Sequence, residues 1–195
     1  MQSKLTNVRK LTLWEIDLPD VIEATRYTRS DFYGYDPGTV NIGLAWTRSR
    51  SVMVAKLEME RIKNPVERMK EISRVMSEIE VSMPQTHGFG VHVIEGASFL
   101  DKFRQVELAE ARATILWWIE AYEMGVTHIV PPVSIRKRVF GDVKIKATDF
   151  WESDLPTDAL AALSCLYRAM QLAVEAERMK LRRLELGTED ENVEK

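Results

Sequence analysis

The chain has 195 residues, of which 45% are hydrophobic and 29% charged, a composition typical of one compact globular domain. No apolar run approaches the ~20 residues of a membrane-spanning helix, and the N-terminal segment lacks the apolar core of a secretory signal. The single cysteine, Cys165, excludes an internal disulfide. We therefore expect a soluble protein of a reducing, cytoplasmic compartment.

The charge distribution matters more than the net charge of −3, which by itself argues against a nucleic-acid-binding protein. The last eleven residues, 185–195, contain five acids and one base. The rest of the chain carries 26 basic and 25 acidic residues. A cationic stretch interrupted only by Asp142 contains Arg136, Lys137, Arg138, Lys144 and Lys146. Such a cluster can engage phosphates, although a solvated hairpin explains the same charges.

The first half of the chain predicts mainly strands. Residues 1–30 show neither strand nor helix periodicity, so we treat them as an N-terminal extension of unknown structure. Three runs then follow, FYGYD, NIGLAWT and SVMVAKLEM, whose aromatic and β-branched residues predict a three-stranded meander. Residues 65–80 repeat apolar side chains every three or four positions after Pro65, which predicts an amphipathic helix.

The second half alternates strands and helices. The segments VHVIE and THIV predict short strands, separated by an Ala-rich helix over 106–124 that Gly125 closes. A last helix is expected from near Pro156 to about Leu186, with Gly187 beyond its end and a disordered acidic tail after it. Strands alternating with helices after a meander predict an α/β domain with a mixed sheet.

Acidic residues stand at the ends of several predicted elements. Asp36 ends the first strand of the meander and Glu95 ends VHVIE, while Asp154 and Asp158, four positions apart, would share a face at the start of the last helix. Carboxylates that converge are explained if they surround Mg²⁺ or Mn²⁺, which prefer oxygen ligands. Taken singly, Asp36 can be a turn residue, Glu95 a surface acid and Asp154 an N-cap.

Four segments resemble, in order, the motifs of RuvC-like Holliday junction resolvases in the RNase H superfamily. Residues 35–45, YDPGTVNIGLA, resemble the first active-site motif, and Ile94-Glu95 resembles the second. Residues 132–147 resemble the basic segment with its central glycine, and TDALA at 157–161 resembles the final helix motif. The resemblance implies an RNase H-like mixed β-sheet flanked by α-helices.

The resemblance covers roughly residues 31–175. We therefore divide the chain into the extension 1–30, a nuclease domain 31–178, and a segment 179–195 that holds the end of the last helix and the acidic tail.

The activity that this resemblance implies is Mg²⁺-dependent resolution of four-way DNA junctions in recombination and repair. Two ions per active site, Mg²⁺ or alternatively Mn²⁺, would clamp the attacking and leaving oxygens of the phosphodiester. Asp36, Glu95 and Asp158 are the implied metal ligands, with Asp154 as a fourth. Lys144 or Lys146, together with Arg136 or Lys137, would hold the scissile phosphate, and Arg138 belongs to the same DNA-binding stretch.

Two departures from the family pattern concern the fourth ligand and the DNA wedge. Bacterial RuvC enzymes have an acid or histidine three residues before the last aspartate, where this chain has Leu155; the spacing of Asp154 is similar to that of fungal mitochondrial resolvases. The aromatic that follows the second acid in RuvC proteins is matched by Phe99 with an offset of one residue, and core packing explains Phe99 as well.

The partners implied are branched DNA and a second copy of the chain, because a two-fold symmetric junction suits a C₂ homodimer. Trp117, Trp118 and the last helix could supply the dimer surface, although aromatic residues on an apolar helix are more often core. The implied location is the cytoplasm, for a nucleoid-associated protein or a viral factor in a host cell. The three histidines lack zinc-binding spacing, and Cys165 fits the core better than a nucleophile.

Other functions stay open on the sequence alone. They are a non-catalytic RNase H-fold module that binds nucleic acid, and a broader nuclease acting on branched DNA or RNA. A nucleotide-dependent phosphotransferase of the actin-like group is disfavoured, since those proteins need two such domains and this chain has room for one.

Overall fold

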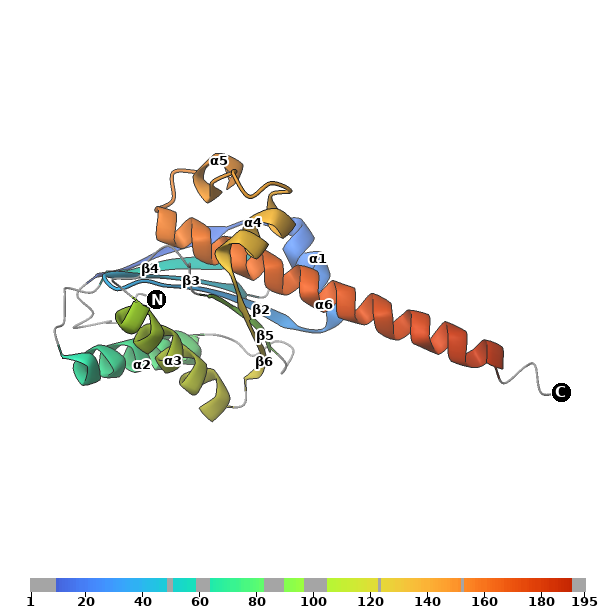
Figure 1. The fold of residues 1–195 in the computed structure, drawn as a ribbon, viewed down its shortest axis with the longest axis horizontal. Coiled ribbons are helices and arrows are strands. Elements are labelled where there is room, and N and C mark those ends of the chain that lie inside the picture. Colours follow the sequence, from blue (N-terminus) through green and yellow to red (C-terminus); the bar gives the residue numbers. More distant parts are fainter. Residues whose placement is uncertain are drawn as a thin grey trace.

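Figure 1 shows the computed structural model of the chain. It describes residues 10–48, 51–58, 64–82, 90–96, 105–122, 124–151 and 153–190. No helix within these ranges is both long and apolar enough to cross a membrane.

A mixed six-stranded sheet forms the centre of the fold, in the order β1-β4-β3-β2-β5-β6. The predicted meander is confirmed as three antiparallel strands, and the two predicted short strands lie parallel to the first of them. The strands are β1 (Lys10–Ile16), β2 (Asp31–Pro37), β3 (Asn41–Arg48), β4 (Ser51–Glu58), β5 (Gly90–Glu95) and β6 (Gly125–Val130). The α/β class and the mixed sheet are therefore confirmed.

Helices cover both faces of the sheet (Figure 1). One face carries α1 (Pro19–Thr28), α4 (Pro132–Val139), α5 (Ala147–Trp151) and α6 (Thr157–Asp190), and the other carries α2 (Pro65–Ser82) and α3 (Gln105–Ala121). Two hydrophobic cores result, one centred on α6 and one on α2 and α3. The central strands are buried on both faces, which explains why they are almost continuously apolar.

Part of the segment treated as an N-terminal extension belongs to the sheet. β1 pairs antiparallel with residues 52–58 of β4, and α1 packs on α6 and buries Val21 and Ile22. The pattern was missed because β1 is an edge strand that leaves Leu13 44% exposed, so its apolar residues do not mark one buried face. Residues 1–9 lie outside the described part of the chain.

Two more elements differ from expectation. The hairpin alternative for the cationic stretch is wrong: residues 132–139 form α4, which begins at a proline and buries Ile135 and Val139 one turn apart. The last helix continues past Gly187 to Asp190, since one glycine in an exposed helix costs only about 1 kcal/mol and does not end it.

Glycines in neighbouring strands allow α6 to pack directly on the sheet. A Cβ added at Gly34 would lie 2.1 Å from the carbonyl oxygen of Ala162, and one added at Gly43 would lie 1.9 Å from that of Asp158. Both distances are far shorter than any normal contact with backbone. The first turns of α6 are therefore held against β2 and β3 at a separation that only glycine permits.

Replacing Gly34 by alanine should push α6 off the sheet. We expect Gly34→Ala to lower the free energy of unfolding by roughly 1–3 kcal/mol, the usual cost of overpacking, measured by urea denaturation. Gly96→Ala is the matched control, because its Cβ would meet nothing closer than 3.3 Å. Equal losses in the two variants would show that the close approach at Gly34 does not limit stability.

A buried histidine links β2, β5 and the start of β6. The ring of His92 stacks on Tyr33 at a centroid distance of 4.3 Å, and the Tyr35 hydroxyl lies 3.0 Å from Nδ1. Nε2 lies 3.2 Å from the carbonyl oxygen of Met124. Because a carbonyl only accepts, Nε2 donates its hydrogen there and Nδ1 accepts from Tyr35. Burial of this neutral ring lowers the pKa of His92 from 6.5 to about 4.

This lowered pKa predicts acid sensitivity of the fold. The unfolded chain binds a proton at His92 below about pH 6.5 and the folded chain only near pH 4, so stability is lost as the pH falls between these values. The loss should approach about 3 kcal/mol. Chemical denaturation of the wild type and His92→Phe at pH 7.5 and pH 4.5 measures it. We expect His92→Phe to have a lower free energy of unfolding than the wild type at pH 7.5, and this difference to shrink at pH 4.5. An unchanged difference would contradict the lowered pKa of His92 as the cause.

Candidate active site

Strand register brings Asp36 and Glu95 to the same end of the sheet. Asp36 is near the end of β2 and Glu95 ends β5, and the two parallel strands are paired so that Tyr35 lies opposite Ile94. Asp36 lies four positions after Phe32 and Glu95 two positions after Val93, and both of these apolar residues belong to the core centred on α6. Because every second side chain of a strand lies on the same face, both acids lie on the α6 face. Gly43 of β3 is the register partner of Asp36.

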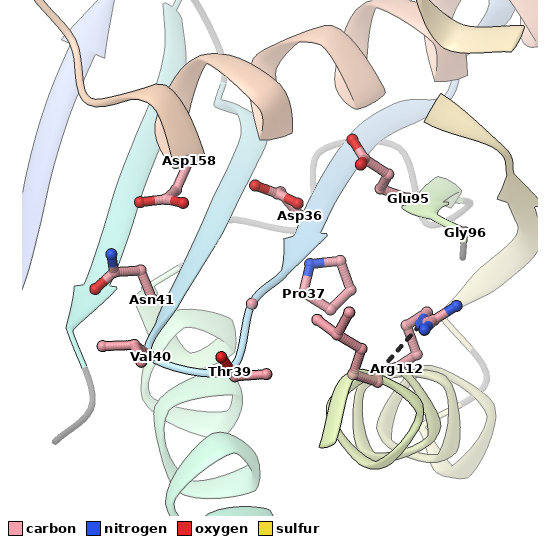
Figure 2. A pocket seen from close by; sticks show the side chains of 11 residues that line it. Asp36, Pro37, Thr39, Val40, Asn41, Glu95, Gly96, Arg112 and Asp158 are labelled. Atoms are coloured by element: carbon pink, nitrogen blue, oxygen red, sulfur yellow. Dashed lines mark hydrogen bonds between the residues drawn. The ribbon is translucent and has the colours of Figure 1, made fainter. Parts of the chain in front are cut away.

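Asp158 reaches the same place from the first turn of α6. Its carbonyl oxygen lies over Gly43, the glycine that pairs with Asp36, so the close packing of α6 on β3 sets its position. Figure 2 shows the three carboxylates around one pocket, with Asp36 between Asp158 and Glu95.

The carboxylates line two adjoining cavities. The first, of about 280 Å³, is bounded by Asp36, Glu95 and Asp158, by the turn at 37–41, and by Arg112 of α3. The second, of about 560 Å³, shares Asp36 and Glu95 with the first and adds Arg136 and Lys146. Asp36 and Glu95 therefore lie between an acidic cavity and a cavity that carries two cations.

The buried acids differ in how well their charge is compensated. Burial raises the pKa of Asp36 well above its usual range, and the negative charges of Glu95 and then Asp158 raise it further. Burial also raises the pKa of Glu95, but Arg136 and Arg112 act in the opposite direction. The charge on Asp36 is thus less compensated than that on Glu95, and a bound cation would offset it.

The donor chemistry fits a hard divalent cation, because every acidic group of the cavity offers carboxylate oxygens. Within the described residues, however, no three His, Cys, Asp or Glu side chains are gathered closely enough to hold a metal ion as they stand. Asp36, Glu95 and Asp158 would have to move closer together to bind one ion.

Comparison with known proteins identifies the fold. No protein-family profile matches the chain, and no curated protein matches its sequence. Among solved structures, Thermus thermophilus RuvC in complex with a Holliday junction substrate superimposes with a TM-score of 0.57 at 12% identity, covering 76% of this chain and 96% of RuvC. A second T. thermophilus RuvC structure gives 0.53 at 12% identity, covering 73% and 93%. The chain has a RuvC-like fold.

The RuvC-like fold confirms the fold expected from the sequence motifs, an RNase H-like mixed sheet flanked by helices. The superposition covers 96% of that RuvC chain and 76% of this chain. At 12% identity the likeness concerns the fold, so activity has to be argued from the chemistry of the cavity.

The RuvC-like arrangement gathers three of the four predicted acids. Asp154 is different: it lies exposed in the turn before α6 and lines neither cavity. The expectation that it shares a helical face with Asp158 is wrong, because α6 begins only at Thr157 and the helical repeat does not extend back to it. Its role as a fourth ligand stays a prediction.

Only some of the predicted cations lie at the site. Arg136 of α4 and Lys146 of the following loop line the cavity that holds Asp36 and Glu95. The others, Lys137, Arg138 and Lys144, are exposed and line neither cavity. Phe99, the predicted wedge, lies outside the described residues.

Sequence analysis missed three polar residues of the first cavity, Thr39, Asn41 and Arg112. Arg112 lies on α3, and its Nε donates to the carbonyl oxygen of Leu108 at 3.1 Å (Figure 2). It is the only cation of an otherwise Ala-rich helix, a signal that the sequence does contain. Asn41 begins β3 and brings an amide to the cavity.

Cys165 is fully buried, which confirms that it belongs to the core. Burial raises the pKa of its thiol, and the negative charges of Glu95 and Asp36 raise it further.

Removing the charge of Asp36 should separate fold stability from metal binding. In EDTA at pH 8, Asp36→Asn should unfold at a higher temperature than the wild type, because the pKa of Asp36 is raised and its ionised form destabilises the fold as the pH rises. Mg²⁺ at about 100 times its dissociation constant should stabilise the wild type by about 2.7 kcal/mol and leave Asp36→Asn nearly unchanged.

Thermal unfolding with and without Mg²⁺ measures both effects. Asp154→Asn is measured beside Asp36→Asn, because this exposed acid lies outside both cavities and an intact Mg²⁺ response in the variant would remove it from the set of ligands. A Mg²⁺ response that survives in Asp36→Asn would place the ion elsewhere. A response lost in Asp154→Asn would make that residue the fourth ligand.

Proposed function

We propose that the chain is a divalent-metal-dependent endonuclease that cuts branched DNA, four-way junctions in particular, during recombination and repair. The observation that carries the proposal is the meeting of Asp36, Glu95 and Asp158, from three separate elements, at one cavity of a RuvC-like fold. One of the similar solved structures is RuvC with a Holliday junction substrate, which supports branched DNA as the substrate class.

Each group of the site has a distinct role in this proposal. Asp36, Glu95 and Asp158 would hold two Mg²⁺ ions, or Mn²⁺, which supply an activated water and stabilise charge on the phosphate and the leaving oxygen. Arg136 and Lys146 lie in the cavity that shares Asp36 and Glu95, so they are the cations best placed to bind the scissile phosphate.

The remaining cations are assigned to binding rather than to the reaction. Lys137 and Arg138 are exposed on α4 and Lys144 in the loop after it, where they would contact phosphates flanking the cut. Such contacts raise affinity for any DNA sequence and hold the substrate in register. Phe99 stays a proposed wedge.

We also propose that the enzyme acts as a homodimer. The two adjacent tryptophans of α3 differ in burial. Trp118 is 1% exposed and belongs to the core, whereas Trp117 is 62% exposed and is available for a dimer contact. Ile129 of β6 is 54% exposed, and in the described sheet β6 pairs only with β5. An exposed indole on α3, the helix that packs beside β6, and an exposed isoleucine on β6 itself support a protein contact at this edge of the sheet.

Cleavage of end-labelled DNA tests the activity. Four-way junction, replication fork and linear duplex are incubated with wild type and Asp36→Asn in Mg²⁺, Mn²⁺ or EDTA. We expect paired, symmetric cuts in opposite strands of the junction, which require two active sites, with metal present. Asp36→Asn should cut at least about 100-fold more slowly, because it removes the central carboxylate of the site.

Each other outcome has a defined meaning. Cutting of every branched substrate would point to a broader structure-selective nuclease. Junction binding without cutting in either metal would overturn the catalytic proposal and favour a non-catalytic RNase H-fold module. Unpaired cuts in one strand would contradict the homodimer.

A further inference from the structure

The last turns of α6 extend well beyond the sheet (Figure 1). This extension is rich in exposed basic side chains: Arg178, Lys180, Arg182 and Arg183 all lie on it. They are not part of the two cavities that contain the carboxylates. The cations of the extension therefore have no role in the site described above.

A contact with α4 shows which face of α6 continues the basic surface formed by the exposed Lys137 and Arg138 of α4. Gln171 donates from Nε2 to the carbonyl oxygen of Arg138 at 3.2 Å, so the Gln171 face of α6 is turned towards α4. With 3.6 residues per turn, positions seven and eleven residues later return to within about 20° of the same face. These positions are Arg178 and Arg182.

The result is a line of exposed cations that begins on α4 and continues along α6. Arg138 lies beside Gln171, and Arg178 and Arg182 follow at about 10 Å and 16 Å along the axis, since each residue advances 1.5 Å. Glu175 lies near this face but forms an ion pair with Arg168 at 3.3 Å. Beyond Leu184 the sequence turns acidic, which ends the line.

The distance from the carboxylates to the end of this line matches the repeat of DNA. Thr157 of α6 lines the cavity that holds Asp36, Glu95 and the two cations, and it lies about 40° from the Gln171 face. Arg178 and Arg182 follow it by 21 and 25 positions on the same helix, or about 32 Å and 38 Å. One turn of B-form DNA advances about 34–36 Å. A duplex that runs from the cavity alongside α6 therefore presents its phosphates to the same side again at Arg178 and Arg182.

We propose that Arg178 and Arg182, on the face of α6 that continues from Arg138 of α4, bind the phosphate backbone of a duplex arm about one helical turn from the cleavage site. This inference rests on the proposed function and adds a DNA contact outside the catalytic cavities. Its consequence is a requirement for arm length, because an arm shorter than one turn does not reach these arginines.

Apolar side chains of the extension do not favour a second copy of the chain as the occupant. Met179, Leu181 and Leu184 are exposed, but they are spread over roughly 200° of the helix circumference. A coiled coil needs them in one stripe. The arginines, in contrast, form one line that continues the basic surface of α4.

The test compares two double variants that remove the same charge from different faces. Arg178→Ala with Arg182→Ala removes the proposed contact. Lys180→Ala with Arg183→Ala is the control, because these residues lie more than about 100° away from the Gln171 face. Binding of the full chain is measured in EDTA, across a salt series, to junctions with arms of about 20 or about 6 base pairs. The longer arms span more than one helical turn.

The arginine variant should bind the long-armed junction roughly ten-fold more weakly than wild type, with a salt slope smaller by about 2. It should bind the short-armed junction as wild type does and cut it at the same rate in Mg²⁺. The control variant should bind the long-armed junction within about two-fold of wild type.

Three results would overturn the inference while leaving the nuclease proposal intact: equal weakening by both double variants, equal weakening on both arm lengths, or no weakening. A fourth is a change of oligomeric state in the arginine variant with junction binding unchanged, which would assign the helix to a protein contact. A wild-type protein that binds no junction would overturn the proposed function and this inference together.

Discussion

The packing of α6 against β2 and β3 is the constraint on which the site depends. Gly34 and Gly43 bring the helix backbone within a distance of the sheet that no side chain would permit. Because the carbonyl of Asp158 lies over Gly43, and Gly43 pairs with Asp36, the same contact fixes two carboxylates relative to each other. The third, Glu95, follows from the pairing of β2 with β5.

Burial of the carboxylates and the repulsion between them oppose this packing. Burial and the neighbouring acids both disfavour the ionised form of Asp36, while Arg112 and Arg136 partly compensate Glu95. Burial raises the pKa of both acids and the arginines partly compensate only Glu95, so a bound cation would stabilise the ionised cavity. The two cations of the adjoining cavity, Arg136 and Lys146, complement an anionic phosphate in the same way.

Much of this arrangement was predictable because the deciding signals are local. Asp36 and Glu95 stand at or next to the ends of apolar strands, so their place at the end of the sheet follows from the sequence. Their face does not, because these strands are buried on both faces. Asp158 was predictable as an acid in the first turn of a long helix. Asp154 was not, because the start of that helix depends on the turn at 153–156 and not on the apolar repeat.

What could not be predicted depends on contacts distant in sequence. β1 is recognisable only through its pairing with β4, about 40 positions later, because an edge strand with an exposed leucine has no clear alternation of its own. The choice of Arg136 and Lys146 among five candidate cations depends on how α4 and the loop after it turn back over the sheet. The line of arginines along α6 becomes visible only once the contact of Gln171 with Arg138 is known.

The central claim is that Asp36, Glu95 and Asp158 together bind divalent cations. Anomalous diffraction from crystals of the full chain grown with Mn²⁺ tests it most directly, because the signal locates each ion without assumptions about the reaction. The account predicts manganese within about 2–2.5 Å of an Asp36 carboxylate oxygen, with Glu95 or Asp158 completing each coordination shell. Manganese bound only elsewhere on the chain, with the three carboxylates still apart, would contradict it.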